Sequence, residues 1–240
     1  MAGKGLAVDA MKKVNVPNRK VHQGKTPAGK SRAPNFAKVA QELAVIGRGF
    51  YSRGWVLGTS GNFSAVVSRE PLRLAITSTG LDKGNLASAH FLEMDADSKI
   101  IRGKGKPSAE ALLHLAIVHS REAGAVLHTH SVWSTALSGA HAAEGGVALE
   151  GYEMLKGLEG VRTHEHREWL PILENSQDMA GLSRVVSKTL SERPGIHGFL
   201  LRGHGLYTWG ANLEEAKRHV EILEFLMEVV GRSRASGKTP

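Results

Sequence analysis

The stretch Gly124–Ser131, GAVLHTHS, runs from small and apolar residues into two histidines that are separated by one threonine. A short apolar run of this kind predicts a buried strand, and residues i and i+2 of a strand project from the same face. We therefore expect His128 and His130 to lie side by side where the strand ends, just before a helix over 131–137. Such positions often carry function, so the pair predicts a metal site.

The amino-acid composition limits which residue types can complete this metal site. The chain has no cysteine, so any metal must be held by His, Asp or Glu, and zinc favours imidazole among these. His204 lies in FLLRGHGLYTWG, between two glycines that let the backbone approach a metal closely. Because the chain contains twelve histidines, one H-x-H pair could arise by chance. The second pair, His164 and His166, lies in the polar segment RTHEHRE and is predicted to be in a solvated loop.

The elements on both sides of this stretch indicate an α/β fold. Apolar periodicity and caps predict helices over 35–54, 107–122, 131–137, 150–158, 178–192 and 212–230, and a loop over 138–149. Strands are predicted within 55–67, 72–77, 90–95, 124–130, 169–173 and 197–210. The order follows no strict βαβ rhythm, so we expect three layers, with helices on both faces of a largely antiparallel sheet.

Charge and composition suggest the domain boundaries. Residues 1–33 contain eight Lys or Arg and one Asp, and the remaining 207 residues carry only +1 of the net +8. We expect a disordered basic tail over 1–33, a catalytic domain over 34–232 and a flexible terminus over 233–240. The near-neutral body argues against a nucleic-acid partner, although a nucleic-acid-binding arm remains an alternative for the tail. No run of about 18 apolar residues and no signal-like start is present, so we expect no membrane span and a cytoplasmic protein.

Two small-residue loops and two carboxylates complete the candidate site. GTSGNFS (58–64) and TSTG (77–80) offer backbone N–H groups and hydroxyls to a phosphate, with Ser108 and Lys83 nearby, although ordinary turns use the same residues. Glu110 is predicted in the first turn of a helix opened by Ser108, where it could serve the helix dipole alone. Spacing does not distinguish Glu150 from Glu153 as a second acidic candidate.

Five motifs taken in order resemble the class II aldolase/adducin-head family. They are GTSGNFS, TSTGLDKG, KPSAEALLH, GAVLHTHS and GFLLRGHGLYTWG. The resemblance covers about residues 35–232. Within that family, LEGYEMLKGLEG followed by LPILEN looks like the methylthioribulose-1-phosphate dehydratase branch, which belongs to methionine salvage.

The resemblance implies a fold, an assembly and roles for individual residues. It implies a three-layer class II aldolase-like fold, one zinc ion per subunit, and a homotetramer with sites near subunit boundaries. It makes His128, His130 and His204 the zinc ligands and Glu153 the acid/base residue, with Glu110 matching the acid/base residue of the aldolases. Substrate contacts fall to Asn62, Ser78, Thr79, Gly80, Ser108 and Glu110; Ala109 stands where aldolases often have a second serine.

The implied reaction is a zinc-dependent dehydration of a phosphorylated sugar. Glu153 removes the C3 hydrogen beside the C2 ketone, and the C4 hydroxyl leaves as water. The enol then gives the 2,3-diketone. Two alternatives stay open: a zinc aldolase or epimerase that uses Glu110 as the base, and a non-catalytic binding module like the adducin head.

Overall fold

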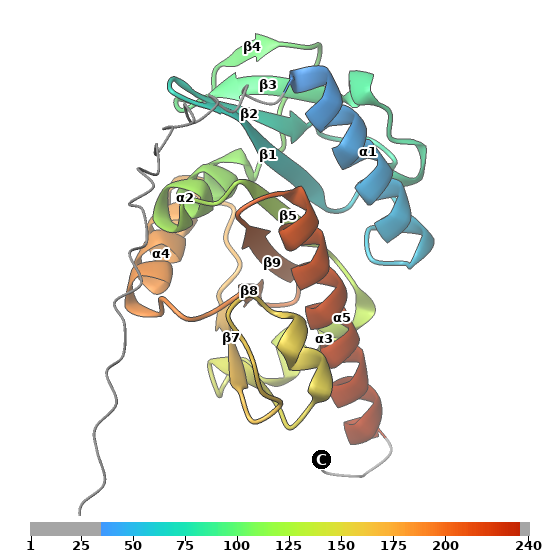
Figure 1. The fold of residues 1–240 in the computed structure, drawn as a ribbon, viewed down its shortest axis with the longest axis vertical. Coiled ribbons are helices and arrows are strands. Elements are labelled where there is room, and N and C mark those ends of the chain that lie inside the picture. The colour runs from blue at the N-terminus through green and yellow to red at the C-terminus, as the bar shows by residue number, and fades with distance from the viewer. Residues whose placement is uncertain (1–34, 236–240) are drawn as a thin grey trace, which may run out of the picture. The chain divides into compact units, whose positions relative to one another are not determined.

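A nine-stranded sheet forms the centre of the computed structural model, which describes residues 35–235 (Figure 1). The strand order is β4-β3-β2-β1-β5-β9-β8-β7-β6. All the neighbouring strands pair antiparallel except β7 and β8, so the predicted largely antiparallel sheet is confirmed. The strands are β1 Asn62–Arg69, β2 Leu72–Thr77, β3 Phe91–Asp95, β4 Ile100–Arg102, β5 Ala125–Thr129, β6 Gly146–Glu150, β7 Arg167–Leu173, β8 Gly198–Leu201 and β9 Gly205–Gly210.

Helices cover both faces of this sheet, which confirms the predicted three layers. On one face lie α1 (Phe36–Ser52), α3 (Val132–Ala140) and α5 (Leu213–Ala235), and on the other lie α2 (Ala111–Arg121) and α4 (Met179–Glu192) (Figure 1). Three short 3-10 helices lie between strands, namely η1 Lys83–Asn85, η2 Ser88–His90 and η3 Glu153–Gly157. None of the helices in residues 35–235 is both long and apolar enough to span a bilayer.

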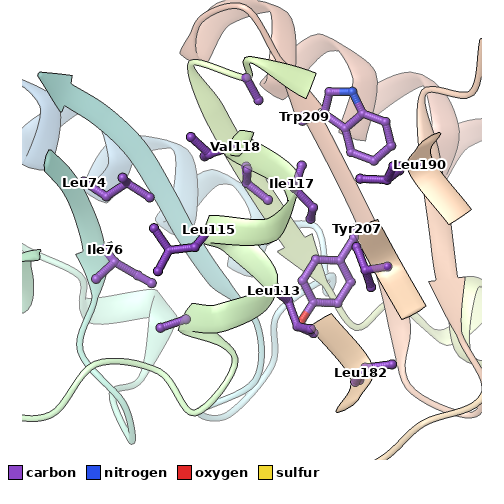
Figure 2. Packing of buried hydrophobic residues seen from close by; sticks show 14 of the residues in the cluster. Leu74, Ile76, Leu113, Leu115, Ile117, Val118, Leu182, Leu190, Tyr207 and Trp209 are labelled. Carbon is purple, nitrogen blue, oxygen red and sulfur yellow. The ribbon is translucent and has the colours of Figure 1, made fainter. Parts of the chain in front are cut away.

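The core beneath α2 and α4 shows how the sequence selects this arrangement. Leu113 of α2, Leu182 of α4 and Tyr207 of β9 meet in one buried cluster (Figure 2). Leu206, the neighbour of Tyr207 in β9, faces the opposite cluster against α5. This alternation of apolar residues on both strand faces is what a sheet covered on both sides requires. Full burial of each such side chain stabilises the fold by about 1.5–3 kcal/mol.

The helix predicted to open at Ser108 begins later, at Ala111, with Glu110 as its N-cap residue. The preceding segment bonds to the residues just after β2, where Pro107 bridges Ser78 and the Thr79 N–H donates to the Lys106 carbonyl at 3.0 Å. These tertiary hydrogen bonds hold the chain out of the helix. Along α2, Leu112 is 38% exposed whereas Leu115 is buried.

A strand, β6, replaces the end of the predicted loop (138–149) and the first residue of the helix predicted over 150–158. Its first residue, Gly146, has no room for a side chain, because a Cβ there would lie 2.3 Å from the Trp169 ring of β7. The glycine that indicated a loop is therefore a packing requirement of strand pairing. The helix predicted over 150–158 is the shorter η3, and the final helix continues beyond Val230 to Ala235.

Candidate active site

Three imidazoles converge where β5 ends beside the turn between β8 and β9. His128 is the penultimate residue of β5, His130 follows that strand, and His204 lies in the turn before β9. The Nε2 atoms of His128 and His130 are 2.7 Å apart, those of His130 and His204 are 3.0 Å apart, and those of His128 and His204 are 3.3 Å apart. The three predicted ligand atoms therefore point at one another.

The glycines around His204 are required by the backbone. A Cβ at Gly205 would lie 2.0 Å from the Thr129 carbonyl oxygen, and Gly203 has a positive φ of 62°. Only glycine accommodates both constraints at low cost. The Thr135 hydroxyl of α3 donates to the His204 carbonyl at 2.9 Å, which fixes the turn against the helix.

The environment of His128 fixes its orientation and its tautomer. Its Nδ1 lies 2.9 Å from the Leu206 carbonyl, so Nδ1 carries the proton and Nε2 presents a lone pair to the other two rings. Its ring also stacks on Tyr207, with centroids 3.9 Å apart and planes 12° apart. A carbonyl oxygen that accepts a hydrogen bond from the second ring nitrogen is a common partner of a metal-binding histidine.

Burial keeps His128 and His130 neutral. Desolvation first, and then the neighbouring rings, hold the pKa of His128 well below its usual value. Desolvation and His204 lower the pKa of His130 to about 4. Neutral imidazole is the form that binds a metal, and zinc–nitrogen bonds of roughly 2.0–2.1 Å separate tetrahedral ligands by about 3.3 Å. The donor set therefore fits a divalent cation such as zinc after a small expansion.

Glu110 lies directly beside the three rings. Its Oε2 accepts a hydrogen bond from Asn62 Nδ2 at 2.5 Å and lies 3.4 Å from His128 Nε2. Its Oε1 lies 3.4 Å from His204 Nε2. The carboxylate thus reaches the centre of the cluster, close enough to exchange a proton with a group bound there.

A buried chain of hydrogen bonds supports Glu110, and it includes a residue that the sequence did not indicate. His114 Nε2 contacts the Asn62 side-chain oxygen, and His114 Nδ1 lies 2.7 Å from Ser64 Oγ. Asn62 donates its side-chain N–H to Glu110, so its side-chain oxygen is free to accept a hydrogen bond from His114 Nε2. The other ring nitrogen of His114, Nδ1, then accepts a hydrogen bond from the Ser64 hydroxyl. Burial lowers the pKa of His114 to about 4. The signal available in the sequence was a histidine four residues after Glu110, on one helical face.

A pocket of about 150 Å³ opens beside the histidines and Glu110. The predicted contacts Asn62, Ser78, Thr79, Gly80 and Ser108 all line it. Three further residues of the predicted loop GTSGNFS (58–64) and Lys83 line it as well. The full lining is Thr59, Ser60, Gly61, Asn62, Ser78, Thr79, Gly80, Lys83, Ser108, Glu110, His130 and His204.

Lys83 gives this wall a positive charge. Its side chain is almost wholly buried, and its Nζ donates to the carbonyls of Thr59 at 3.0 Å and Leu81 at 2.9 Å. Burial lowers its pKa to about 8, against the opposing effect of Asp82. Three donor protons and two carbonyl acceptors leave one N–H for a ligand. Hydroxyls, glycine backbone and one cation form a surface suited to a phosphate.

Glu153 is not brought to this pocket within one chain. It begins η3, its side chain is 72% exposed, and it is not among the lining residues. Its carboxylate pairs with Lys156 at 2.6 Å and lies 3.8 Å from His164. The hydrogen bond from Lys156 is the main cause that lowers the pKa of Glu153.

The second histidine pair does not form one uniform solvated loop. The His164 side chain is 59% exposed, as predicted. His166 also lies in the predicted loop, just before β7, but it is only 30% exposed and binds the buried carboxylate of Glu168, so it is less solvated than expected. This partner lies in β7 and also binds His197, which precedes β8, and local sequence does not reveal that grouping.

Comparison with known proteins agrees with the fold and the motifs. Residues 41–230 match the model of the Class II Aldolase and Adducin N-terminal domain. A methylthioribulose-1-phosphate dehydratase of Sorangium cellulosum is 42% identical over 81% of this chain and 92% of its own length. One from Methylococcus capsulatus is 43% identical over 82% and 95%.

Solved structures of lower sequence identity share the fold of this chain. YgbL from Escherichia coli, described as a putative aldolase/epimerase/decarboxylase, gives a TM-score of 0.68 at 27% identity over 82% of this chain and 90% of that one. An L-fuculose 1-phosphate aldolase gives 0.69 at 23% identity over 84% and 88%, which supports the fold alone. By its sequence match over 190 residues, the chain belongs to the class II aldolase and adducin N-terminal domain family.

Proposed function

We propose that this chain is a zinc-dependent lyase that dehydrates methylthioribulose 1-phosphate to 2,3-diketo-5-methylthiopentyl 1-phosphate. The observation that carries the proposal is the convergence of three imidazoles beside a pocket of hydroxyls, glycines and Lys83. Relatives that are 40–43% identical over most of both chains bear the name of this dehydratase. Such an intact ligand set also favours an enzyme over a binding module.

The two walls of the pocket contact different parts of the substrate. The phosphate lies against Ser78, Thr79, Gly80 and Ser108, where hydroxyls and N–H groups donate and Lys83 supplies charge. The C2 ketone and the C3 oxygen lie toward His128, His130 and His204. Zinc held by these residues supplies Lewis-acid chemistry that polarises the ketone and acidifies the C3 hydrogen.

Side chains of the protein then carry out the proton transfers. In this proposal Glu153 takes the C3 hydrogen as a proton and passes a proton to the C4 hydroxyl, which leaves as water. Glu110, held by Asn62, orients the polar groups at the centre of the cluster. The resulting enol tautomerises to the 2,3-diketone, so one water is lost and the carbon chain stays intact.

Glu153 can act in this way only if it reaches a pocket of another subunit. It is exposed and lies outside the pocket of its own chain, whereas an acid/base residue must touch the reacting atoms. We therefore propose a homotetramer in which η3 of one subunit borders the pocket of a neighbour. The exposed Met154 beside it, 41% accessible, gives η3 an apolar side chain that such an interface would cover.

One observation favours a second candidate, a zinc-dependent aldolase or epimerase acting on another sugar phosphate. Glu110 lies 3.4 Å from two of the ligand nitrogens, which places a carboxylate at the reacting centre without any help from another subunit. With Glu110 as the base, the C3–C4 bond would break in place of the C4–O bond. The two functions share the metal chemistry and differ in the placement of the base.

Product analysis tests the proposal directly. The zinc-loaded full chain is incubated with methylthioribulose 1-phosphate, and products are identified by mass spectrometry. Loss of one water with the carbon chain intact supports the dehydratase. Two shorter fragments support the aldolase. An unchanged substrate, with stoichiometric zinc verified, rejects methylthioribulose 1-phosphate as the substrate of both.

A further inference from the structure

A second cluster of ligand-type side chains lies apart from the proposed active site. It consists of His166, Glu168 and His197, whose nearest nitrogen and oxygen atoms all lie within 4.8 Å of one another. His166 Nε2 and His197 Nδ1 each lie 2.9 Å from the same oxygen of Glu168, Oε2. These separations match the 2.7–3.3 Å among the nitrogens of the first cluster.

The surroundings hold these side chains in the orientation that a metal requires. The second ring nitrogen of His197, Nε2, lies 2.8 Å from the Glu159 carbonyl, so it donates there and leaves Nδ1 directed at Glu168. The other oxygen of Glu168, Oε1, accepts the backbone N–H of His197 at 2.8 Å. In metal sites, the ligand imidazoles usually donate their second N–H to a carbonyl, and the ligand carboxylates usually accept a further hydrogen bond.

Burial and access also suit a bound cation. The Glu168 side chain is 1% exposed, whereas those of His197 and His166 are 14% and 30% exposed. The two histidines line a cavity of about 470 Å³, separate from the pocket beside His128. Three protein ligands on one side and open space on the other leave a coordination position for water.

An ion pair alone explains only part of this arrangement. His197 by itself, through its ring and its backbone N–H, bonds to both oxygens of Glu168. That pairing does not require His166, whose Nε2 lies 2.9 Å from the same Oε2. Two imidazoles and one carboxylate form a donor set that zinc accepts, and it is poorly suited to magnesium, which prefers oxygen ligands.

We propose that His166, Glu168 and His197 form a second binding site for a borderline divalent cation such as Zn²⁺. The site joins the start of β7 to the segment before β8, and its open position faces the 470 Å³ cavity. It is independent of the cation proposed at His128, His130 and His204, and of the reaction proposed there.

Metal counting on the full chain tests this site. The protein is stripped with a chelator, dialysed into buffer containing Mg²⁺, and titrated with Zn²⁺ alone; bound zinc is then measured per chain. We expect about two equivalents in the unchanged protein and about one in the His166→Ala variant. We expect dehydratase turnover of that variant, measured at saturating zinc, to stay within about twofold of the unchanged protein.

His164→Ala is the matched control, because His164 lies two residues earlier, is exposed and lies outside the cluster. It should retain both equivalents. In a second background, His130→Ala, the remaining equivalent should disappear when His166→Ala is added, which separates this site from the first even if the proposed reaction is wrong. One equivalent in the unchanged protein, or two in a folded His166→Ala variant, would overturn the proposal.

Discussion

At the scale of single residues, the site depends on protonation states set by burial. His128 has its ring stacked on Tyr207, its Nδ1 on the Leu206 carbonyl and its pKa far below the usual value because of desolvation. A charged imidazole there would meet two others within 3.3 Å. A bound cation removes this conflict, because it gives all three lone pairs a common partner.

The first prediction concerns His130→Ala. A site left with two protein ligands should lose most of its affinity, so bound zinc should fall by one equivalent per chain and turnover should be lost with it. Zinc content by mass spectrometry and turnover are measured on the same sample. His119→Ala, on the exposed side of α2, is the control and should change neither. Full zinc content in both variants would mean that His130 is not a ligand.

The second prediction compares the two carboxylates. Glu153→Gln should keep the fold and the zinc, because the side chain is exposed, while turnover falls by about 10²–10⁴-fold. Glu110→Gln should reduce turnover by a smaller factor if Glu110 only orients neighbouring groups. The aldolase alternative predicts the opposite order. Near-normal turnover of zinc-loaded Glu153→Gln would remove Glu153 from the mechanism.

At the scale of elements, α5 contributes a buried acid to the strand that carries the histidines. Glu224 is 2% exposed and accepts a hydrogen bond from Thr129, the residue between His128 and His130. Desolvation raises its pKa to about 7, against the opposing bonds from Ser131 and Thr129. The carboxyl is therefore protonated in the folded protein over a pH range in which the unfolded chain ionises it.

The third prediction follows from this linkage. Between about pH 4.5 and 7 the unfolded chain releases the Glu224 proton first, so this group favours unfolding increasingly as the pH rises. Glu224→Gln removes that effect. The free energy of unfolding of the variant, relative to the unchanged protein, should rise across this range by up to about 3 kcal/mol and be constant on either side. Parallel denaturant titrations measure it, and a difference that does not vary with pH would contradict the shifted pKa.

Element boundaries show what the sequence could and could not reveal. Strand β5 and the start of α1 after Asn35 agree with the predicted ranges, because they depend on a local apolar run and a local cap. The late start of α2 and the strand β6 were missed. The first depends on hydrogen bonds to residues 78–79, and the second depends on Trp169 packing over Gly146. The pocket residues were brought together as expected, whereas Glu153 lies exposed outside the pocket of its own chain.

At the scale of the whole molecule, the basic segment 1–33 lies outside the described residues, and the predicted tail remains a prediction. Its charge and its low content of large apolar residues give it little to contribute to a core. Deleting residues 1–33 should therefore leave melting temperature, zinc content and turnover unchanged. Thermal unfolding and steady-state kinetics of the shortened chain provide the test; a large loss in any of these would show that the segment docks on the domain.

The last prediction concerns the assembly, because the proposed base and the proposed metal ligands must come from different subunits. Glu153→Gln and His130→Ala chains are each expected to be inactive. When they are unfolded together in equal amounts and refolded, some pockets combine intact ligands from one chain with an intact Glu153 from the other. Random mixing should restore about a quarter of the wild-type activity.

The matched control for this mixing experiment replaces Glu153→Gln with Glu110→Gln. Glu110 lies 3.4 Å from His128 and His204 of its own chain, so it belongs to the same pocket as the ligands. Mixing cannot place an intact Glu110 beside intact ligands of the other chain, and activity should stay at the level of the separate variants. Restoration with Glu153→Gln but not with Glu110→Gln would assign the two carboxylates to different subunits. Mixed assemblies, verified by mass, that stay inactive in both cases would place the acid/base residue within a single chain and favour Glu110.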